Sequence, residues 1–270
     1  MNLLKTLCEI QAPCGEESAL SKFLLNYIHT NMSKWKVQPT IFHGDSLQDC
    51  LVLVFGNPRT AIFAHMDSIG YNVKYDNEII KIGGPSTKEG ILLIGQDSRG
   101  KIEEPLRHKN DKNGNTIYYI DGRPVDRGTS LTFKPHFRET DKFVQCCYMD
   151  NRLGVWNALK VAETLQDGII CFSAWEEHGG GSVGYLAKFI YERYGVKQAL
   201  ISDITWVTKG VKHGKGAAIS IRDSGIPRRS YINRIIELAT KSGLPFLYFK
   251  ATRGPLLSLL GLLLRYSQCI

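Results

Sequence analysis

Four short clusters of acidic or histidine side chains follow strand-like apolar runs, and this placement constrains the fold more than any other feature of the sequence. The runs cover residues 60–63, 143–148, 168–174 and 198–201. The clusters are Ala64-His65-Met66-Asp67, Met149-Asp150-Asn151-Arg152, Trp175-Glu176-Glu177-His178-Gly179 and Ile201-Ser202-Asp203. Ligands of open α/β sheets bind in a crevice at the strand ends. The pattern therefore predicts that these side chains share one site.

Helical and strand-like segments alternate along most of the chain. Apolar residues recur at helical spacing in 3–10, 16–28, 151–165, 182–193 and 229–240. Further strand-like runs occupy 35–42, 51–55 and 217–221. Glu16 and Glu17 stand where the second helix would begin, a place where the helix dipole favours acidic side chains. This alternation predicts an α/β domain with helices packed on a sheet.

The region between about residues 70 and 145 has a different pattern. Short strand-like pieces at 78–82, 90–94, 116–120 and 130–133 are separated by charged or glycine-containing turns, with no helical spacing between them. Such strands predict a small β barrel or sandwich. We therefore expect a discontinuous catalytic α/β domain (1–69 and 146–248), a β-barrel-like domain inserted at 70–145, and an atypical tail at 249–270.

Composition limits the classes of partner. The chain has 270 residues, of which 43% are hydrophobic and 22% charged, as expected for a globular protein with a sizeable core. The net charge of +8 is compatible with a polyanionic partner, but the basic residues are dispersed and form no run longer than Arg228-Arg229. The sequence therefore predicts no nucleic-acid partner.

The cysteines and the apolar stretches bear on the compartment. The seven cysteines include no CxxC pair, so neither a thiolate zinc cluster nor a redox motif is indicated. The segment after Met1 lacks the apolar region and cleavage site of a signal peptide. The leucine-rich stretch 256–264 is too short to span a membrane. We expect reduced thiols, a cytoplasmic location and no membrane partner.

The side chains of the four clusters suit a divalent metal. In the His-x-Asp arrangement, His65 can bind a metal while Asp67 accepts the other ring N–H. Glu176 and Glu177 are adjacent carboxylates after an apolar strand, where they repel each other unless a cation compensates them. A histidine with several carboxylates suits zinc, cobalt or manganese. Because one glutamate is then free to take a proton from water, the clusters predict a metal-dependent hydrolase.

Each cluster also has a simpler interpretation when it is taken alone. The His-x-Asp pair fits a surface histidine beside a turn, and Asp150 precedes a predicted helix, where aspartate is a favoured N-cap. Asp203 fits a turn residue after a strand, and Glu176-Glu177 fits an exposed acidic turn. Further candidate ligands are His43, His178 and His213. The metal interpretation therefore depends on the four clusters together.

The order of these motifs resembles the dinuclear metal aminopeptidases of the glutamyl, deblocking and tetrahedral (TET) family. The matching segments are Ala64-His65-Met66-Asp67-Ser68-Ile69-Gly70, Gly122-Arg123-Pro124-Val125-Asp126-Arg127-Gly128, Met149-Asp150-Asn151-Arg152-Leu153-Gly154, Glu176-Glu177 and Ser202-Asp203. The likeness runs from the N-terminus to about residue 248. It implies an α/β/α sandwich of the zinc-exopeptidase type with an inserted small β-barrel domain.

The resemblance also implies a role for each residue. His65 and Asp203 would bind one metal, Glu177 the other, and Asp150 would bridge both. Asp67 would orient His65, and Glu176 would be the general base for a metal-bridging hydroxide. The implied activity is removal of N-terminal residues from peptides, with two zinc, cobalt or manganese ions per subunit. Members of the family assemble into large cytoplasmic homo-oligomers.

One departure from the family pattern affects the second metal position. Family members carry a later Gly-Gly-[Ser/Thr]-Asp stretch and a late histidine ligand, and neither occurs after Pro245. We therefore expect weaker occupancy at Glu177 and impaired activity, unless His178 or His213 compensates. From its composition, we interpret the tail from residue 249 as the product of a different reading frame or of an early stop. Two alternatives stay open: a non-catalytic or partly active metal-binding subunit of this fold, and a related N-acyl deacylase or carboxypeptidase.

Overall fold

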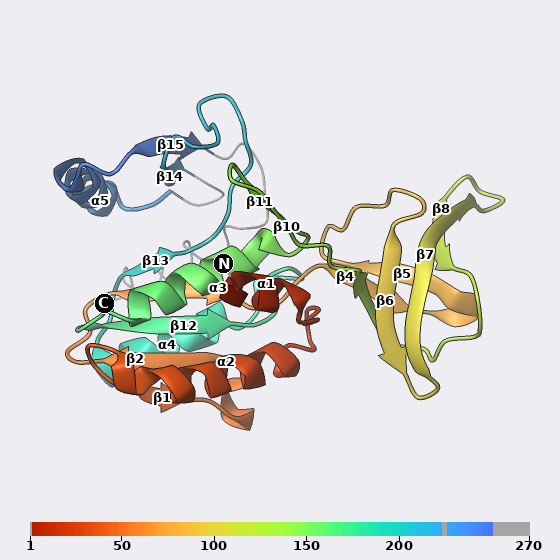
Figure 1. Cartoon of the computed structure of the whole chain (residues 1–270), viewed down its shortest axis with the longest axis horizontal. Coiled ribbons are helices and arrows are strands. Elements are labelled where there is room, and N and C mark those ends of the chain that lie inside the picture. Colours follow the sequence, from red (N-terminus) through yellow and green to blue (C-terminus); the bar gives the residue numbers. More distant parts are fainter. Residues whose placement is uncertain (1, 223–225, 251–270) are drawn as a thin grey trace.

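The computed structural model describes residues 2–222 and 226–250. A mixed sheet of five strands forms the centre of its larger body (Figure 1). The strand order is β1-β2-β12-β3-β13. The bounds are β1 Thr40–Phe42, β2 Leu51–Phe55, β3 Ala61–His65, β12 Gly168–Ser173 and β13 Ala199–Ile201. Strands β12 and β13 both pair with β3 in parallel. The carboxyl ends of these three strands therefore lie at one edge of the sheet.

Helices cover both faces of this sheet. On one face lie α1 (Asn2–Glu9), α2 (Ser18–Asn31) and α3 (Met149–Ala162), and on the other lies α4 (Val183–Tyr194). Alternate residues of β2 enter the two cores, so that Leu53 packs with the first face and Val52 with the second. This double burial explains why β2 and β12 read as continuous apolar runs.

The middle of the chain forms a closed barrel beside the sheet (Figure 1), in the strand order β4-β5-β8-β7-β6-β9. The bounds are β4 Gly70–Val73, β5 Glu78–Ile82, β6 Leu92–Asp97, β7 Gly100–Asn110, β8 Thr116–Ile120 and β9 Ser130–Phe133. Tyr71, Leu93, Leu106 and Leu131 are fully buried in its core. The predicted fold class, an α/β sandwich with a small inserted barrel, is confirmed.

Two predicted strands are wrong in extent. The run 143–148 contains only β11 (Val144–Gln145), which pairs with β10 (Arg138–Glu139) in a short hairpin. Asp150 therefore does not follow a buried strand. In the run 35–42 only β1 pairs as a strand, and residues 35–37 form bends.

The C-terminal part of the described chain stands apart from the central sheet. Strands β14 (Ala217–Arg222) and β15 (Phe246–Lys250) pair in parallel with each other, joined through α5 (Arg229–Ser242). Beyond Lys250, the predicted tail (249–270) lies outside the described residues. Among the helices that the structure describes, none has the length and apolar character needed to cross a membrane.

Candidate metal centre

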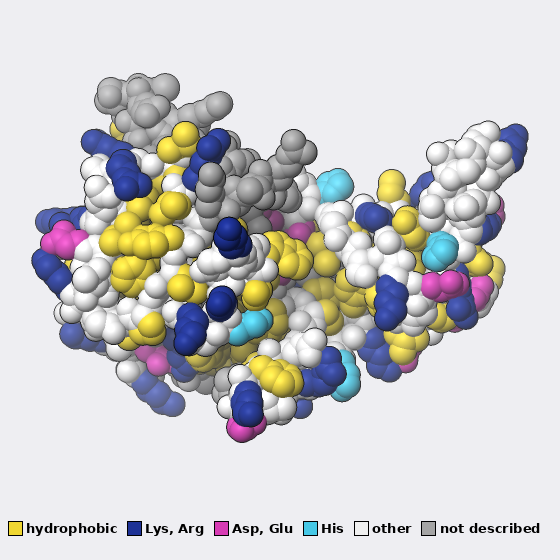
Figure 2. Space-filling model, turned by 90° about the horizontal axis from the view of Figure 1, so that it is seen from above, with side chains coloured by type: hydrophobic (Ala, Val, Ile, Leu, Met, Phe, Trp, Pro, Cys, Tyr) yellow, Lys and Arg dark blue, Asp and Glu magenta, His cyan; other side chains and the backbone are white. Residues whose placement is uncertain are grey.

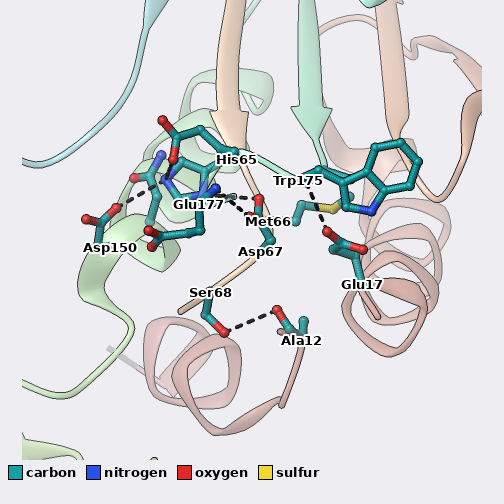
Figure 3. A network of polar contacts seen from close by, with 12 residues as sticks. Ala12, Glu17, His65, Met66, Asp67, Ser68, Asp150, Trp175 and Glu177 are labelled. Atoms are coloured by element: carbon teal, nitrogen blue, oxygen red, sulfur yellow. Dashed lines mark hydrogen bonds and ion pairs between the residues drawn. The ribbon is translucent and has the colours of Figure 1, made fainter. Parts of the chain in front are cut away.

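His65 is the buried centre of the site. It ends β3 and is 4% exposed, while Asp67, two residues on, is fully buried. His65 Nδ1 lies 3.4 Å from Asp67 Oδ1, and these two buried atoms have no other partner in the described part of the chain. Asp67 Oδ2 accepts the backbone N–H of Glu177 at 2.8 Å (Figure 3). Asp67 therefore holds the chain that follows β12 and faces the imidazole ring of His65.

Two aspartates from other elements face the remaining ring nitrogen. His65 Nε2 lies 3.1 Å from Asp150 Oδ1 and 3.9 Å from Asp203 Oδ2. Asp150 stands at the start of α3 and Asp203 follows β13. One ligand atom from each of the three residues falls within 4.8 Å of the others. The sheet edge thus brings together residues that are 138 positions apart in the sequence (203 − 65).

The paired glutamates lie at the same edge. Glu176 is 8% exposed, and its Oε2 lies 3.9 Å from His65 Nε2. Glu177 is placed through its backbone contact with Asp67, and its side chain is drawn beside His65 in Figure 3. It does not belong to the group of three that comes within 4.8 Å among the described residues.

Glu17 is a site residue that the sequence interpretation missed. Its carboxylate was expected to stabilise the start of α2, but it turns inward, is 1% exposed and makes no side-chain cap on that helix. Its Oε1 accepts the backbone N–H of Trp175 at 3.0 Å (Figure 3) and that of Gly15, also at 3.0 Å. Trp175 has a positive φ of 63°, a conformation that is uncommon for a bulky residue. Glu17 therefore holds the turn that presents Glu176 and Glu177.

The segment after Asp150 joins α3 to the rest of the site. Asn151 donates from its side-chain amide to the carbonyl of Ser202 at 2.9 Å, and its side-chain oxygen accepts the N–H of Gly154 at 3.0 Å. The Arg152 guanidinium is fully buried and donates to the carbonyls of Leu7, Met66 and Ile10. These contacts fix Asp150 relative to both His65 and Asp203.

Burial shifts the acid–base behaviour of the site. Burial, with the charge of Asp150, raises the pKa of Glu177 to about 8, and burial raises the pKa of Asp203 to about 7. The pKa of Glu176 is also raised, first by burial and then by the charges of Asp67 and Asp150, while the charge of His65 opposes them. For His65, burial lowers the pKa, but hydrogen bonds to Asp150 and Asp67 outweigh it and raise the pKa well above its ordinary value. The carboxylates thus repel one another in a poorly solvated space.

The donor set fits a divalent cation. An imidazole with several carboxylates is the chemistry of zinc, cobalt and manganese sites. A cation would relieve the repulsion that raises the pKa values of Glu177 and Asp203. The pair of Asp67 with His65 Nδ1 leaves Nε2 as the ligand atom, which is the usual arrangement around a metal-binding histidine.

The other candidate donors lie away from this group or already make hydrogen bonds to the backbone. His43 and His213 are exposed and belong to no donor group that the described residues form. His178 is exposed, and its Nδ1 accepts the N–H of Gly83 at 3.3 Å. Cys14, Glu17 and Asp67 form a second group of donors within 4.8 Å, but Glu17 and Asp67 are already bound to the backbone there. On the face seen in Figure 2, lysine and arginine side chains are scattered rather than gathered around one hollow.

Comparisons with known proteins match this chain to aminopeptidases. The family model of the M42 glutamyl aminopeptidases matches residues 122–254. Structures with the same fold include a TET aminopeptidase from a marine sediment Thaumarchaeota archaeon, with a TM-score of 0.75, 15% identity, and coverage of 94% of this chain and 82% of that chain. The Desulfurococcus kamchatkensis aminopeptidase APDkam598 gives a TM-score of 0.75 and 19% identity, with coverage of 94% of this chain and 80% of that chain.

The TET1 peptidase of Pyrococcus horikoshii, which assembles into a tetrahedron or a large octahedral shell, gives a TM-score of 0.71 and 21% identity over 94% of this chain and 84% of that chain. No curated protein sequence matches the chain. The family resemblance predicted from the sequence motifs is confirmed by the family model over residues 122–254 and by the shared fold.

Proposed function

We propose that this protein removes N-terminal residues from peptides at a centre formed by His65, Asp150, Glu177 and Asp203. The observation that carries the proposal is the convergence of His65, Asp150 and Asp203, from three different elements, within 4.8 Å. His65 and Asp203 would hold one divalent ion (zinc, cobalt or manganese), Glu177 the other, and Asp150 both. When bound, the ions would supply Lewis-acid polarisation of the scissile carbonyl and lower the pKa of water.

Glu176 is the proposed general base. Its carboxylate is buried and lies 3.9 Å from His65 Nε2, so it faces the place where the ligands meet. Because burial raises its pKa, it is better suited to take a proton from the attacking water and return it to the leaving amine. Asp67 Oδ1 faces His65 Nδ1 at 3.4 Å and would favour the tautomer that carries the proton on Nδ1 and presents Nε2 as a ligand.

Assembly and domain division complete the proposal. We expect residues 1–69 and 146–248 to act as the catalytic domain and residues 70–145 as an inserted domain. The oligomeric shells of Pyrococcus horikoshii TET1 support a homo-oligomer here as well. Light scattering on the purified protein tests this, and a mass equal to that of a single chain at all concentrations would contradict it.

The experiment compares Glu176→Gln with Asp203→Asn on aminoacyl-p-nitroanilides, with added cobalt or zinc. Glu176→Gln should lower kcat by roughly 10²- to 10⁴-fold while calorimetric metal binding is retained. Asp203→Asn should weaken metal binding by at least about tenfold, because a ligand oxygen is lost. The control is Glu192→Gln on the exposed side of α4, which should change neither quantity. A wild-type chain that binds metal but cleaves no free-amino substrate would support the non-catalytic alternative instead.

A further inference from the structure

The turn that follows strand β5 of the barrel lies against the segment that carries Glu177. Gly83, the first residue of this turn, donates its backbone N–H to Nδ1 of His178 at 3.3 Å. A Cβ placed on Gly83 would stand 2.9 Å from the carbonyl oxygen of Glu177 and 3.4 Å from its Cβ. The φ of Gly83 is 68°, a conformation that glycine adopts without steric cost. A hydrogen bond and a close packing contact thus bring the barrel main chain onto residues 177 and 178.

The barrel holds this turn from its own side. Ile82, the last residue of β5, pairs with Gly70 of β4. The hydroxyl of Tyr71, whose side chain is fully buried in the barrel core, donates to the carbonyl of Ser86 at 2.5 Å. The turn is therefore tied to the barrel both before Gly83 and after it.

A second contact holds Glu177 from the central sheet. Its backbone N–H donates to Oδ2 of Asp67 at 2.8 Å (Figure 3). The main chain of Glu177 is thus bonded to Asp67 on one side and packed against Gly83 at its carbonyl and Cβ. A ligand side chain is placed more narrowly when the backbone that carries it is held in this way.

We propose that the Gly83 turn of the barrel, acting through His178, positions Glu177 for the metal ion that this carboxylate would hold. The inference rests on the proposed function, because it takes Glu177 as a ligand. Gly83 and His178 are positioning residues, since both act through the main chain of Glu177. Supporting contacts around a ligand change metal affinity by about 10- to 100-fold when they are removed.

The same hydrogen bond argues against His178 as a replacement for the late histidine ligand. A neutral imidazole has one N–H and one acceptor nitrogen. Because Nδ1 of His178 accepts the N–H of Gly83, the ring proton lies on Nε2, which then has no lone pair for a metal ion. His178 would have to give up the Gly83 contact to bind a metal, so positioning and ligation exclude each other.

Two substitutions at residue 178 separate these roles. Asparagine carries Oδ1 where histidine carries Nδ1, so His178→Asn keeps an acceptor for Gly83 but has no atom at the place of Nε2, while His178→Leu has neither. In calorimetric zinc titrations of the metal-free protein, His178→Asn should match the wild type. His178→Leu should bind zinc about tenfold more weakly, in the same part of the isotherm that Glu177→Gln weakens. The control is His213→Asn, at an exposed residue outside the donor groups that the described residues form, and it should match the wild type.

The Gly83 side of the contact has its own variant. Gly83→Ala pushes a methyl group against the Glu177 carbonyl and the Ile69 side chain, and it should also weaken zinc binding by about tenfold. Gly84→Ala controls for an added methyl group in the same turn, since a Cβ there meets nothing within 4 Å. Gly114→Ala controls for the backbone strain, because Gly114 has a φ of 82° and open space around it. Neither control should change zinc affinity.

Hydrogen exchange at the Gly83 amide measures the hydrogen bond without any metal. In ¹⁵N-glycine-labelled protein treated with a chelator, the Gly83 signal is the one that disappears in Gly83→Ala. Its exchange should be roughly three- to tenfold faster in His178→Leu than in the wild type, as expected for the loss of one hydrogen bond. In His178→Asn the rate should stay close to that of the wild type.

The variants give distinct outcomes. Equal zinc isotherms for His178→Leu and the wild type would overturn the positioning role, whether the chain binds one ion or two. Equal losses in His178→Asn and His178→Leu, with Gly83 exchange unchanged in His178→Asn, would make His178 a ligand and overturn it as well. If Glu177→Gln leaves zinc binding unchanged, the ligand assignment of the proposed function fails and this inference fails with it. A loss in Glu177→Gln without one in His178→Leu overturns this inference alone. If Gly83→Ala does not fold, the two variants of the exposed His178 side chain decide by themselves.

Discussion

Arg152 places a buried positive charge beside the candidate metal centre, where its guanidinium donates hydrogen bonds to backbone carbonyls. Its guanidinium is fully buried and donates to carbonyls at the end of α1 and after β3. Burial lowers its pKa to about 10, so it stays charged at neutral pH. The carbonyl of Met66 lies between His65 and Asp67, so Arg152 acts on the geometry of that pair through the main chain.

Arg152→Met should destabilise the protein strongly. The substitution removes the donors from three carbonyls and leaves them buried, which costs about 2–4 kcal/mol in the free energy of unfolding. A thermal scan should show Tm lowered by about 5–10 °C. Arg107→Met is the control, because Arg107 makes exposed ion pairs with Asp121 and Glu89, and its Tm should change by no more than about 2 °C. A Tm for Arg152→Met equal to that of the control would show that the carbonyls find other partners.

The sequence predicts which polar side chains come together at the sheet edge better than it predicts the residues that support them. His65, Asp150 and Asp203 could be found because a titratable side chain at a strand end or helix start is locally recognisable. Glu17 could not, because an acidic residue at the start of a helix has an ordinary local explanation. Only the fold shows that its carboxylate reaches the N–H of Trp175, 158 positions away. Support of this kind depends on tertiary contacts that no local pattern records.

At the scale of elements, the start of α3 touches the chain after β13. A Cβ placed on Gly154 would collide with the carbonyl oxygen of Ser202 and with the Asn151 side chain. The same Asn151 side chain donates to the Ser202 carbonyl at 2.9 Å. The absence of a side chain at residue 154 therefore permits the close approach that brings Asp150 and Asp203 together.

Gly154→Ala should separate the two aspartates and weaken metal binding. The added methyl group must push α3 or the chain at Ser202 aside, so calorimetric affinity for zinc should fall by about tenfold or more. Gly84→Ala is the matched control, because a Cβ at that residue meets nothing within 4 Å. Equal zinc affinities for the two variants would mean that the contact does not determine the spacing of Asp150 and Asp203.

The elements that sequence patterns missed share a physical cause. Strand β7 (Gly100–Asn110) was not predicted, because only Ile102 and Leu106 are buried along it and its charged residues resemble a loop. Its place in the barrel follows from pairing with β6 and β8, which are contacts between strands rather than properties of one segment. The central strands, buried on both faces, were predicted because their burial forces an apolar run.

At the scale of the whole molecule, the site links metal binding to the pH dependence of folding. Burial raises the pKa of Glu177 from 4.5 to about 8 and that of Asp203 from 3.8 to about 7, and the pKa of His65 is also raised. A group whose pKa is higher in the folded state binds more protons there than in the unfolded state between the two values. For these three groups, stability is therefore greatest at low pH and is lost as pH rises through the folded-state pKa.

Metal-free protein should consequently lose stability between about pH 5 and pH 8, by up to about 1.4 kcal/mol per pH unit for each such carboxylate. A bound divalent ion holds the carboxylates ionised and the imidazole neutral in the folded state, so saturating zinc should remove or reverse this slope. Urea unfolding at four pH values, with chelator or with zinc, measures both curves. Asp203→Asn removes one of the titrating groups, so its metal-free curve should be flatter, while Asp141→Asn at an exposed position should follow the wild type. If metal-free stability instead rises steadily from pH 5 to pH 8, the carboxylates are not buried together in solution, and the proposed centre does not form without the ion.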